Sequence, residues 1–297
     1  MKNKIEEIKK YGNVIEDASL KDYTTYKVGG IAPCIVFPYN EKELVKLIRY
    51  LKTNHIKYKL LGNGSNLIFS DKGFDGVLIK LDEFDTFYLE GNKVTVGAGY
   101  SLQKLALKVS RLGLSGLEFA TGIPGTVGGA VFMNAGAYKS DMGYVVESIK
   151  VLTPDFEIKR LYNHELSFHY RTSFLKEHPE YICLEASILL KPGNKEEIME
   201  IIRDRKKRRV ESQPLEYPSA GSVFRNPEGN FAGKLIEDYG MKGKTIGGAK
   251  VSEKHANFII NTGDAKAKDI IDLIHQIQAK IKKETGIELK LEQEIVE

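Results

Sequence analysis

The chain has 297 residues, of which 42% are hydrophobic and 28% charged, with a formal net charge of +4. This length and composition indicate a folded protein of two or three domains and argue against disorder. The mild positive charge does not indicate a nucleic-acid-binding surface. Cys34 and Cys183 lie far apart and form no CxxC pair, which excludes a zinc knuckle or a redox dithiol. No apolar run or signal region suggests membrane insertion, so we expect a cytoplasmic protein.

The predicted elements mix helices and strands without a strict βαβ alternation, which favours an α+β fold. In the first half we expect a helix at 5–10, a strand at 33–39, a helix after the cap residue Asn40, three strands within 57–81, a strand at 93–99 and a helix at 101–112 ended by Gly113. In the second half we expect a hairpin at 145–161, a strand at 180–190, helices at 195–210, 231–240 and 265–284, and a closing strand at 288–297.

Several segments imitate known motifs but fail in detail. "KGKT" at 242–245 lacks the preceding glycine of a phosphate-binding P-loop, because that position is Asp238. "HELSFH" places His164 and His169 five residues apart, about 140° around a helix, so they would not share a face and we expect no metal site. The basic run at 205–209 is interpreted as a solvated helix end, with a role near a ligand phosphate as the alternative.

Glycine-rich turns follow strands at 62–66, at 96–99 and within "ATGIPGTVGGAVFMNAGAY" at 120–138. Glycine lets the backbone approach a ligand closely, and together these turns suggest an extended anion such as a pyrophosphate. A helix opening near Gly128 could also face a phosphate. The alternative is a closely packed backbone corner that binds nothing.

The last hundred residues carry a second group of polar candidates. "PSAGSVFRNP" holds Ser222, Arg225 and Asn226, and in an extended strand Ser222 and Asn226 would point to one face. The closing "LEQEI" places Glu292 and Glu294 on a common face. Each of these features is also common in proteins where it has only a structural role.

The motifs together, in their order along the chain, resemble the UDP-N-acetylenolpyruvoylglucosamine reductase family. The segments that carry the resemblance are "TTYKVGG", "LGNGSNLIFSD", "GLSGLEFATGIPGTVGGAVFMNAGAY", "YRTSF", "SQPLEYPSAGSVFRNP", "AGKLIE", "VSEKHANFIIN" and "LEQEI". The resemblance spans about 23–294 and is to the shorter type, which lacks an inserted tyrosine loop. The abrupt end at Glu297 is a departure, because family members often continue further.

The resemblance implies an FAD-binding module of the p-cresol methylhydroxylase-like class, with two subdomains at 1–80 and 81–193, and a substrate-binding α+β domain at 194–297. It further implies FAD as cofactor and NADPH as reductant. The residues implied to hold FAD are Gly62, Asn63, Gly64, Ser65, Asn66, Gly122, Pro124, Gly125, Thr126, Gly128, Gly129 and Ala130.

The implied reaction reduces a UDP-sugar enolpyruvyl ether to UDP-N-acetylmuramate for peptidoglycan. The family positions make Arg171 the residue that neutralises the developing charge, Ser222 the proton donor and Glu294 its neighbour. Arg225 and Asn226 are expected to contact substrate. We expect a monomer that binds neither nucleic acid nor membrane. The alternatives are a flavin oxidase or dehydrogenase of the same fold that acts on an alcohol or hydroxy acid, and a non-catalytic protein that binds nucleotide sugars.

Overall fold

The computed structural model describes residues 2–297, which form two compact units. Unit 1 contains the residues up to Glu16, Cys34–Asn63 and Gly76–Arg208. Unit 2 contains Asp17–Pro33, Gly64–Asp75 and Arg209–Glu297. Each unit is therefore assembled from segments that are far apart in the sequence, and the chain crosses between the units repeatedly.

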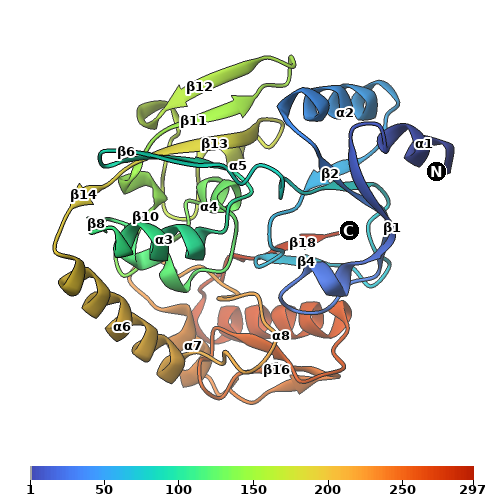
Figure 1. Ribbon diagram of the computed structural model, residues 1–297. Helices are drawn as coiled ribbons and strands as arrows, with labels where there is room; N and C mark the ends of the chain where they lie inside the picture. The colour runs from blue at the N-terminus through green and yellow to red at the C-terminus, as the bar shows by residue number, and fades with distance from the viewer. Residues whose placement is uncertain (1) are drawn as a thin grey trace. The chain divides into compact units, whose positions relative to one another are not determined.

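Unit 1 holds most of the helices and both larger sheets (Figure 1). Its helices are α1 Lys2–Ile8, α2 Glu41–Thr53, α3 Leu102–Arg111, α4 Val127–Met133, α5 Phe174–Glu177 and α6 Lys195–Ser212, whose last turn passes into unit 2, and its short 3-10 helices are Glu118–Gly122, Met142–Tyr144 and Asn163–Glu165. Its strands are β1 Gly12–Ser19 and β2 Ile31–Pro38, both crossing the unit boundary, then β3 Tyr58–Leu60, β5 Val77–Ile79, β6 Phe87–Glu90, β7 Lys93–Gly97, β8 Leu114–Ser115, β9 Gly136–Ala137, β10 Ser140–Asp141, β11 Val146–Leu152, β12 Ile158–Tyr162, β13 Ile182–Leu189 and β14 Lys191–Pro192.

Two sheets of different type organise unit 1. The four-stranded sheet has the order β1-β2-β5-β3, and β5 runs parallel to both β2 and β3. Its core residues pack against α1 and α2 through side chains such as Ile8, Leu44 and Val77. The five-stranded sheet has the order β12-β11-β13-β7-β6, and its neighbouring strands are antiparallel. This mixture of a parallel and an antiparallel sheet confirms the predicted α+β class.

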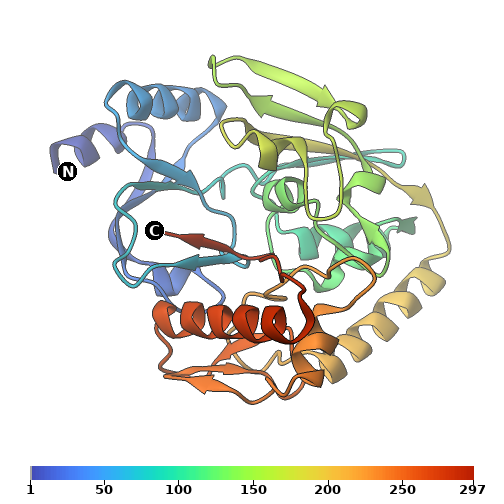
Figure 2. The same cartoon turned by 180° about the vertical axis from the view of Figure 1, so that it is seen from behind.

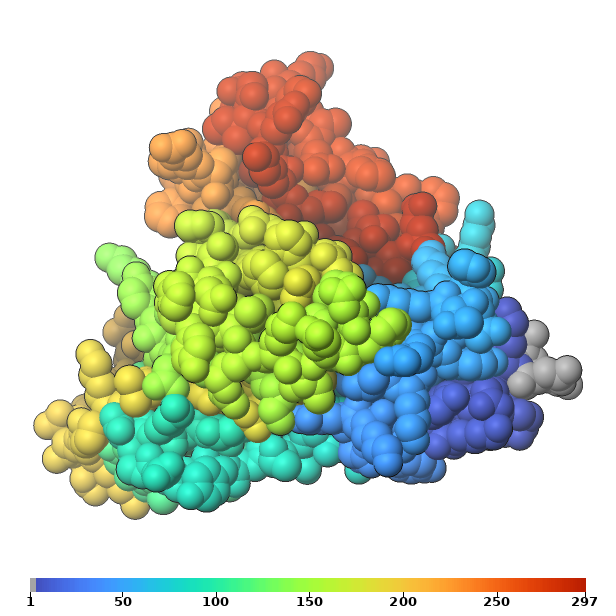
Figure 3. Space-filling view, turned by 90° about the horizontal axis from the view of Figure 1, so that it is seen from above, coloured from blue at the N-terminus to red at the C-terminus, as the bar shows by residue number. Residues whose placement is uncertain are grey.

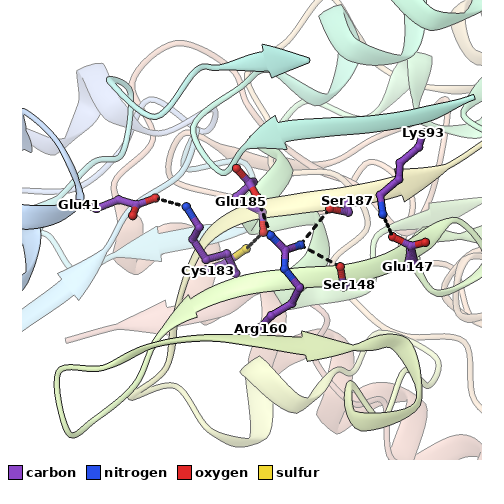
Figure 4. Close-up of polar contacts among 9 residues, drawn as sticks. Glu41, Lys93, Glu147, Ser148, Arg160, Cys183, Glu185 and Ser187 are labelled. Atoms are coloured by element: carbon purple, nitrogen blue, oxygen red, sulfur yellow. Dashed lines mark hydrogen bonds and ion pairs between the residues drawn. The ribbon is translucent and has the colours of Figure 1, made fainter. Parts of the chain in front are cut away.

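The two faces of the five-stranded sheet differ because side chains alternate along each strand. One face packs with α3 and α4 in a buried cluster that includes Val94, Ile149 and Ala186. On the other face Arg160 donates from Nη1 to the hydroxyls of Ser148 and Ser187, at 3.1 Å each. Its Nη2 donates to the Glu185 carboxylate at 3.2 Å, and Figure 4 shows this network spanning three strands. Strand β12, which carries Arg160, is largely exposed and belongs to the yellow-green part of the surface in Figure 3.

Unit 2 is smaller and forms around α8. Its elements are the 3-10 helix Leu20–Tyr23, β4 Leu67–Phe69, α7 Ala232–Asp238, β15 Thr245–Ile246, β16 Ala249–Val251, β17 Ile259–Asn261, α8 Ala267–Thr285 and β18 Glu294–Val296. Helix α8 packs on β15 and β16, as seen from behind in Figure 2. Gly286 adopts a left-handed conformation (φ +74°) directly after α8, the usual way to end a helix. Strand β18 pairs in parallel with β4, which lies far from it in sequence.

Most predicted elements are present, with shifted ends. The side chain of Asn40 caps α2 by accepting from the Glu43 amide, as expected. Ser101 caps α3 in the same way, and Gly113 follows with φ +76°. The closing strand is shorter than expected, and β6 was not predicted from the sequence. The segment "HELSFH" forms the end of a short 3-10 turn and a loop.

Both cysteines are buried and unpaired, and burial raises the pKa of Cys34 to about 11 and that of Cys183 to about 12. Such thiols stay protonated near neutral pH and are therefore weak nucleophiles. Within residues 2–297 no cluster of three or more His, Cys, Asp or Glu side chains is arranged to hold a metal ion. Nor does any helix in that range combine the length and the apolar character needed to cross a bilayer.

Candidate active site

The glycine-rich turns of unit 1 come together around the start of α4. The Gly128 amide donates to the Ala98 carbonyl at 2.8 Å, and the Val127 amide donates to the Tyr100 carbonyl at 2.9 Å. Gly62 lies beside the same helix end, because a Cβ added there would be 3.0 Å from Thr126 Oγ1. The parts of the three turns that belong to unit 1 thus meet at the start of α4, although Gly62 and Thr126 are about sixty residues apart in the chain.

The first turn of α4 offers space for a ligand and few amide donors. Thr126 Oγ1 accepts from the Gly129 amide at 3.2 Å, so the amides of 127, 128 and 129 are all bonded inside the protein. Gly129 is nevertheless exposed, and a Cβ added there would meet no atom closer than Thr126 Oγ1 at 3.3 Å. Packing of the protein itself therefore does not demand glycine at 129. A flat ligand lying directly against the backbone would demand it, and this fits an FAD site.

A buried lysine that the sequence analysis missed lies behind the first glycine turn. Lys80 directly follows β5 and is only 7% exposed, and its ammonium donates to the Gly62 carbonyl at 2.8 Å. It also forms an ion pair with Asp82 at 3.3 Å. Lys80 thus fixes the backbone of the turn from the inside. In the sequence it looks like one more polar residue at the end of a strand, so no pattern identified it.

Arg171 lies on a tight turn in unit 1. His169 and Thr172 exchange backbone hydrogen bonds of 3.0 Å across this turn, and Arg171 occupies it with φ +57°. A left-handed conformation costs a residue with a side chain roughly 1–2 kcal/mol, so the surrounding structure must hold it in place. The guanidinium is half-buried, donates from Nη2 to the Gly136 carbonyl at 2.9 Å and stacks near the Tyr170 ring. The turn is thereby connected to the segment that follows α4.

In unit 2 the segment of Ser222 pairs with the segment just before Glu294. The Glu292 amide donates to the Val223 carbonyl, and the Arg225 amide donates to the Lys290 carbonyl, both at 2.9 Å. Ser222 is half-buried and Glu294 is exposed. The backbone pairing thus brings these two predicted residues onto neighbouring segments.

Two buried side chains hold the Ser222 segment. Gln293 is 4% exposed and donates to the carbonyls of Ala220 and Gly221 at 3.0 and 3.2 Å, while its own oxygen accepts from the Tyr26 hydroxyl at 3.1 Å. Asn257 makes two hydrogen bonds with the backbone of Phe224. Burial raises the pKa of Tyr26 above its ordinary value, so its hydroxyl remains a donor. Sequence reasoning did not identify Gln293, Asn257 or Tyr26 as supports of this segment, although each lies inside a motif quoted above.

The remaining predicted residues are divided between the units. Gly62 and Asn63 belong to unit 1, while Gly64, Ser65 and Asn66 belong to unit 2. In unit 2, Asn66 bonds to the closing strand: its side chain donates to the Glu292 carbonyl, and its own carbonyl accepts from the Glu294 amide. Arg225 is half-buried. Asn226 is exposed, and its side-chain oxygen accepts from the Ala232 amide at the start of α7, a structural contact.

Comparison with known proteins gives a consistent picture. Residues 213–296 match the UDP-N-acetylenolpyruvoylglucosamine reductase C-terminal domain, and residues 32–162 match the FAD binding domain. A UDP-N-acetylenolpyruvoylglucosamine reductase from Anoxybacillus flavithermus is 48% identical over 96% of this chain and 95% of its own. The enzyme of that name from Bacillus subtilis is 44% identical over 100% and 99%. The crystal structure of the Thermus caldophilus reductase has a TM-score of 0.84 and 38% identity, covering 97% of this chain and 100% of its own.

Proposed function

The chain belongs to the UDP-N-acetylenolpyruvoylglucosamine reductase family, and we propose that it catalyses the NADPH-dependent reduction of UDP-N-acetylglucosamine enolpyruvate to UDP-N-acetylmuramate, with FAD as cofactor. The observation that carries this proposal is the identity to named reductases over nearly the whole of both chains. Its role would be in peptidoglycan precursor synthesis, and hence in the cell wall, cell shape and cell division.

FAD, when bound, would supply the redox chemistry that carries a hydride from NADPH to C3 of the enolpyruvyl ether. In this proposal the backbone of unit 1 around Gly62 and Gly122–Ala130 would hold the cofactor, and Asn66 of unit 2 is a further predicted contact. The exposed Gly129 supports this assignment, because a side chain there would occupy space that the protein leaves open. Lys80 would keep the Gly62 turn in position from behind.

Arg171 would stabilise the substrate while its charge develops. Hydride addition at C3 leaves an electron pair at C2 that delocalises into the adjacent carboxylate. A guanidinium is always charged and can bind both carboxylate oxygens at once, so it lowers the energy of this dianionic enolate. The strained turn supports this assignment, because left-handed residues with side chains are concentrated at functional sites.

Ser222 would deliver the proton to C2, and Glu294 would lie beside the enolate. A serine hydroxyl is a very weak acid, so its position has to be fixed accurately. The hydrogen bonds that Gln293 and Asn257 make with the backbone on either side of Ser222 support this assignment. Glu294 follows Gln293 directly in the chain, so the hydrogen bonds of the buried Gln293 side chain also help to fix the backbone position of Glu294. Arg225 and Asn226 are proposed as weaker substrate contacts.

The test is anaerobic stopped-flow measurement of the two half-reactions in Ser222→Ala. NADPH should bleach the flavin at a near-normal rate, while reoxidation by the enolpyruvyl substrate should slow by about 10²–10³-fold, as for loss of one critical donor. Ser219→Ala, in the same segment, is the matched control and should leave both rates unchanged. Equal slowing of both half-reactions in Ser222→Ala would remove the proton-donor assignment.

We further propose that the enzyme acts in the cytoplasm as a monomer that binds a small UDP-sugar and neither nucleic acid nor membrane. Its nucleotide substrates and the mild net charge support this. Sedimentation equilibrium of the FAD-loaded protein tests the oligomeric state, and a mass of about twice 33.3 kDa would contradict it.

A further inference from the structure

Asn134 lies at the end of α4, inside the glycine-rich segment at 120–138, and makes several hydrogen bonds although it was not among the predicted site residues. It ends the helix in a left-handed conformation (φ +43°), and its amide donates to the carbonyls of Ala130 and Val131. Its side chain is nearly inaccessible, at 2% exposure for the residue. A buried amide side chain needs hydrogen-bond partners, and here the partners show its role.

The Asn134 side chain bridges two separate loops. Its Oδ1 accepts from the Gly143 amide at 2.9 Å, and its Nδ2 donates to the His169 carbonyl at 2.9 Å. Because one partner is a donor and the other an acceptor, only one orientation of the amide satisfies both. His169 is the residue whose backbone closes the turn around Arg171. The end of α4 is thus joined directly to the base of that turn.

A second buried contact joins the same two elements. The Ser173 hydroxyl donates to the Phe132 carbonyl at 2.7 Å, and Ser173 is 1% exposed. Ser173 lies two residues after Arg171, so Asn134 and Ser173 hold the two sides of the turn. The guanidinium itself reaches Gly136, only two residues beyond Asn134. Both the base and the tip of the turn are therefore set by the segment that ends α4.

We propose that Asn134 is a positioning residue for the reduction of the substrate. It acts through Arg171, by holding the turn that carries the guanidinium against the end of the helix that begins at the proposed cofactor-binding glycines. The inference rests on the proposed function, because it requires Arg171 to act on the substrate. It adds a physical connection, entirely within unit 1, between the cofactor-binding segment and the residue that stabilises the enolate.

The test is Asn134→Asp in the FAD-loaded enzyme at pH 8. Aspartate keeps an acceptor for Gly143 but places a charged oxygen against the His169 carbonyl, so the turn should loosen. Bleaching of the flavin by NADPH should be near normal, and reoxidation by the enolpyruvyl substrate should slow by about 10²-fold, the usual cost of a misplaced catalytic group. Asn92→Asp is the matched control, since Asn92 also donates to a backbone carbonyl in unit 1, and both rates should be unchanged.

A readout independent of turnover is hydrogen–deuterium exchange. The amides of His169 and Thr172, each of which donates to the carbonyl of the other residue, should exchange faster in Asn134→Asp and not in Asn92→Asp. If Asn134→Asp does not fold, Ser173→Ala tests the opposite side of the turn with the same two readouts. Asn134→Gly retains the left-handed backbone and removes only the side chain. Equal slowing of both half-reactions in the variants that fold, or unchanged exchange at the turn, would overturn the inference.

A double-mutant cycle separates this inference from the proposed function. Arg171→Lys should slow reoxidation by itself, and if it does not, the proposed role of Arg171 fails. If Arg171→Lys slows reoxidation, and adding Asn134→Asp slows it by the same further factor as in the parent enzyme, Asn134 does not act through Arg171. In that case only the inference fails. The expected result is that the double variant is slower than Arg171→Lys by less than about 3-fold, because coupled residues are not additive.

Discussion

Two glycines from the predicted cofactor segments, one in each unit, look alike in the sequence and differ in the structure. Gly64 of unit 2 has φ +60°, and a Cβ there would lie 2.0 Å from the Tyr23 carbonyl oxygen. Gly129 of unit 1 is much less constrained, since a Cβ there would approach only the Thr126 side chain, at 3.3 Å, and no backbone atom. The glycine of unit 2 is required by the fold itself. The glycine of unit 1 leaves open space, which is the property expected where a ligand meets the backbone.

The largest effect should come from Gly64→Ala. The new methyl group would overlap backbone atoms that cannot move aside, and the residue would be held in a left-handed conformation. Overpacking and the unfavourable dihedral together should lower the free energy of unfolding by about 3 kcal/mol or more. Denaturant unfolding of the apoprotein measures this. A loss below about 1 kcal/mol would mean that the close packing at Gly64 is relaxed in solution and that the contrast with Gly129 is wrong.

Gln293→Leu should be the next largest. Leucine fills a similar volume but leaves the Tyr26 hydroxyl and the carbonyls of Ala220 and Gly221 without their buried partner. Unsatisfied buried groups of this kind cost about 1–3 kcal/mol in unfolding free energy. Tyr26→Phe is the matched control, because it removes one hydroxyl and should cost only about 1 kcal/mol. A Gln293→Leu variant as stable as Tyr26→Phe would show that Gln293 does not hold the Ser222 segment.

Gly129→Ala tests the other side of the comparison. Alanine is favoured over glycine in a helix by up to about 1 kcal/mol, so the apoprotein should be as stable as the parent or slightly more so. Its affinity for FAD should nevertheless fall by about 10-fold or more, because the methyl group projects into the open space in front of α4. Fluorescence titration of the apoprotein with FAD measures this. Unchanged affinity together with unchanged stability would show that the space at Gly129 is not used by the cofactor.

The sequence predicted the family and most of the elements correctly, because these depend on local pattern, but it missed strands such as β6. Periodicity and the capping residue Asn40 located α2, and Gly113 located the end of α3. The fold class and the FAD and reductase assignments were confirmed by the mixed sheets and by the similarity to named reductases. The individual site residues and the three predicted domains remain predictions. The interleaving of two units was not foreseen, since it depends on pairings such as β18 with β4.

The supports of the site could not be predicted for a related physical reason. Gln293, Asn257 and Asn134 are polar residues whose roles depend on partners remote in the chain, such as Tyr26 for Gln293. A single sequence records the donor and the acceptor but not their pairing. Lys80 illustrates the same limit, because its burial against Gly62 follows only from the folded sheet. A left-handed backbone conformation is also not predictable from the sequence when the residue is not glycine, as at Arg171.

The smallest expected effect is on the pH dependence of the unfolding free energy, and it involves His255 of unit 2. Burial lowers the pKa of His255, and the nearby Lys242 lowers it further, although a backbone hydrogen bond and Glu237 oppose this. The unfolded chain therefore binds a proton more readily than the folded one at this residue. Its contribution to stability is present above about pH 6.5 and is lost as the pH falls below that value toward the folded pKa.

The neutral imidazole of His255 has a structural role, because its Nδ1 accepts a hydrogen bond from the backbone amide of Asn257 at 3.2 Å. The side chain of Asn257 in turn donates to the carbonyl of Phe224. Protonation would remove that acceptor. His255→Gln should therefore lose less unfolding free energy than the parent between pH 7.5 and pH 5.5, as measured by urea midpoints. His275→Gln, on α8, serves as the control for a histidine without this contact and should follow the parent. Identical pH dependence in all three proteins would mean that His255 titrates alike in the folded and unfolded chains, and that the contact with Asn257 contributes nothing to the support of Ser222.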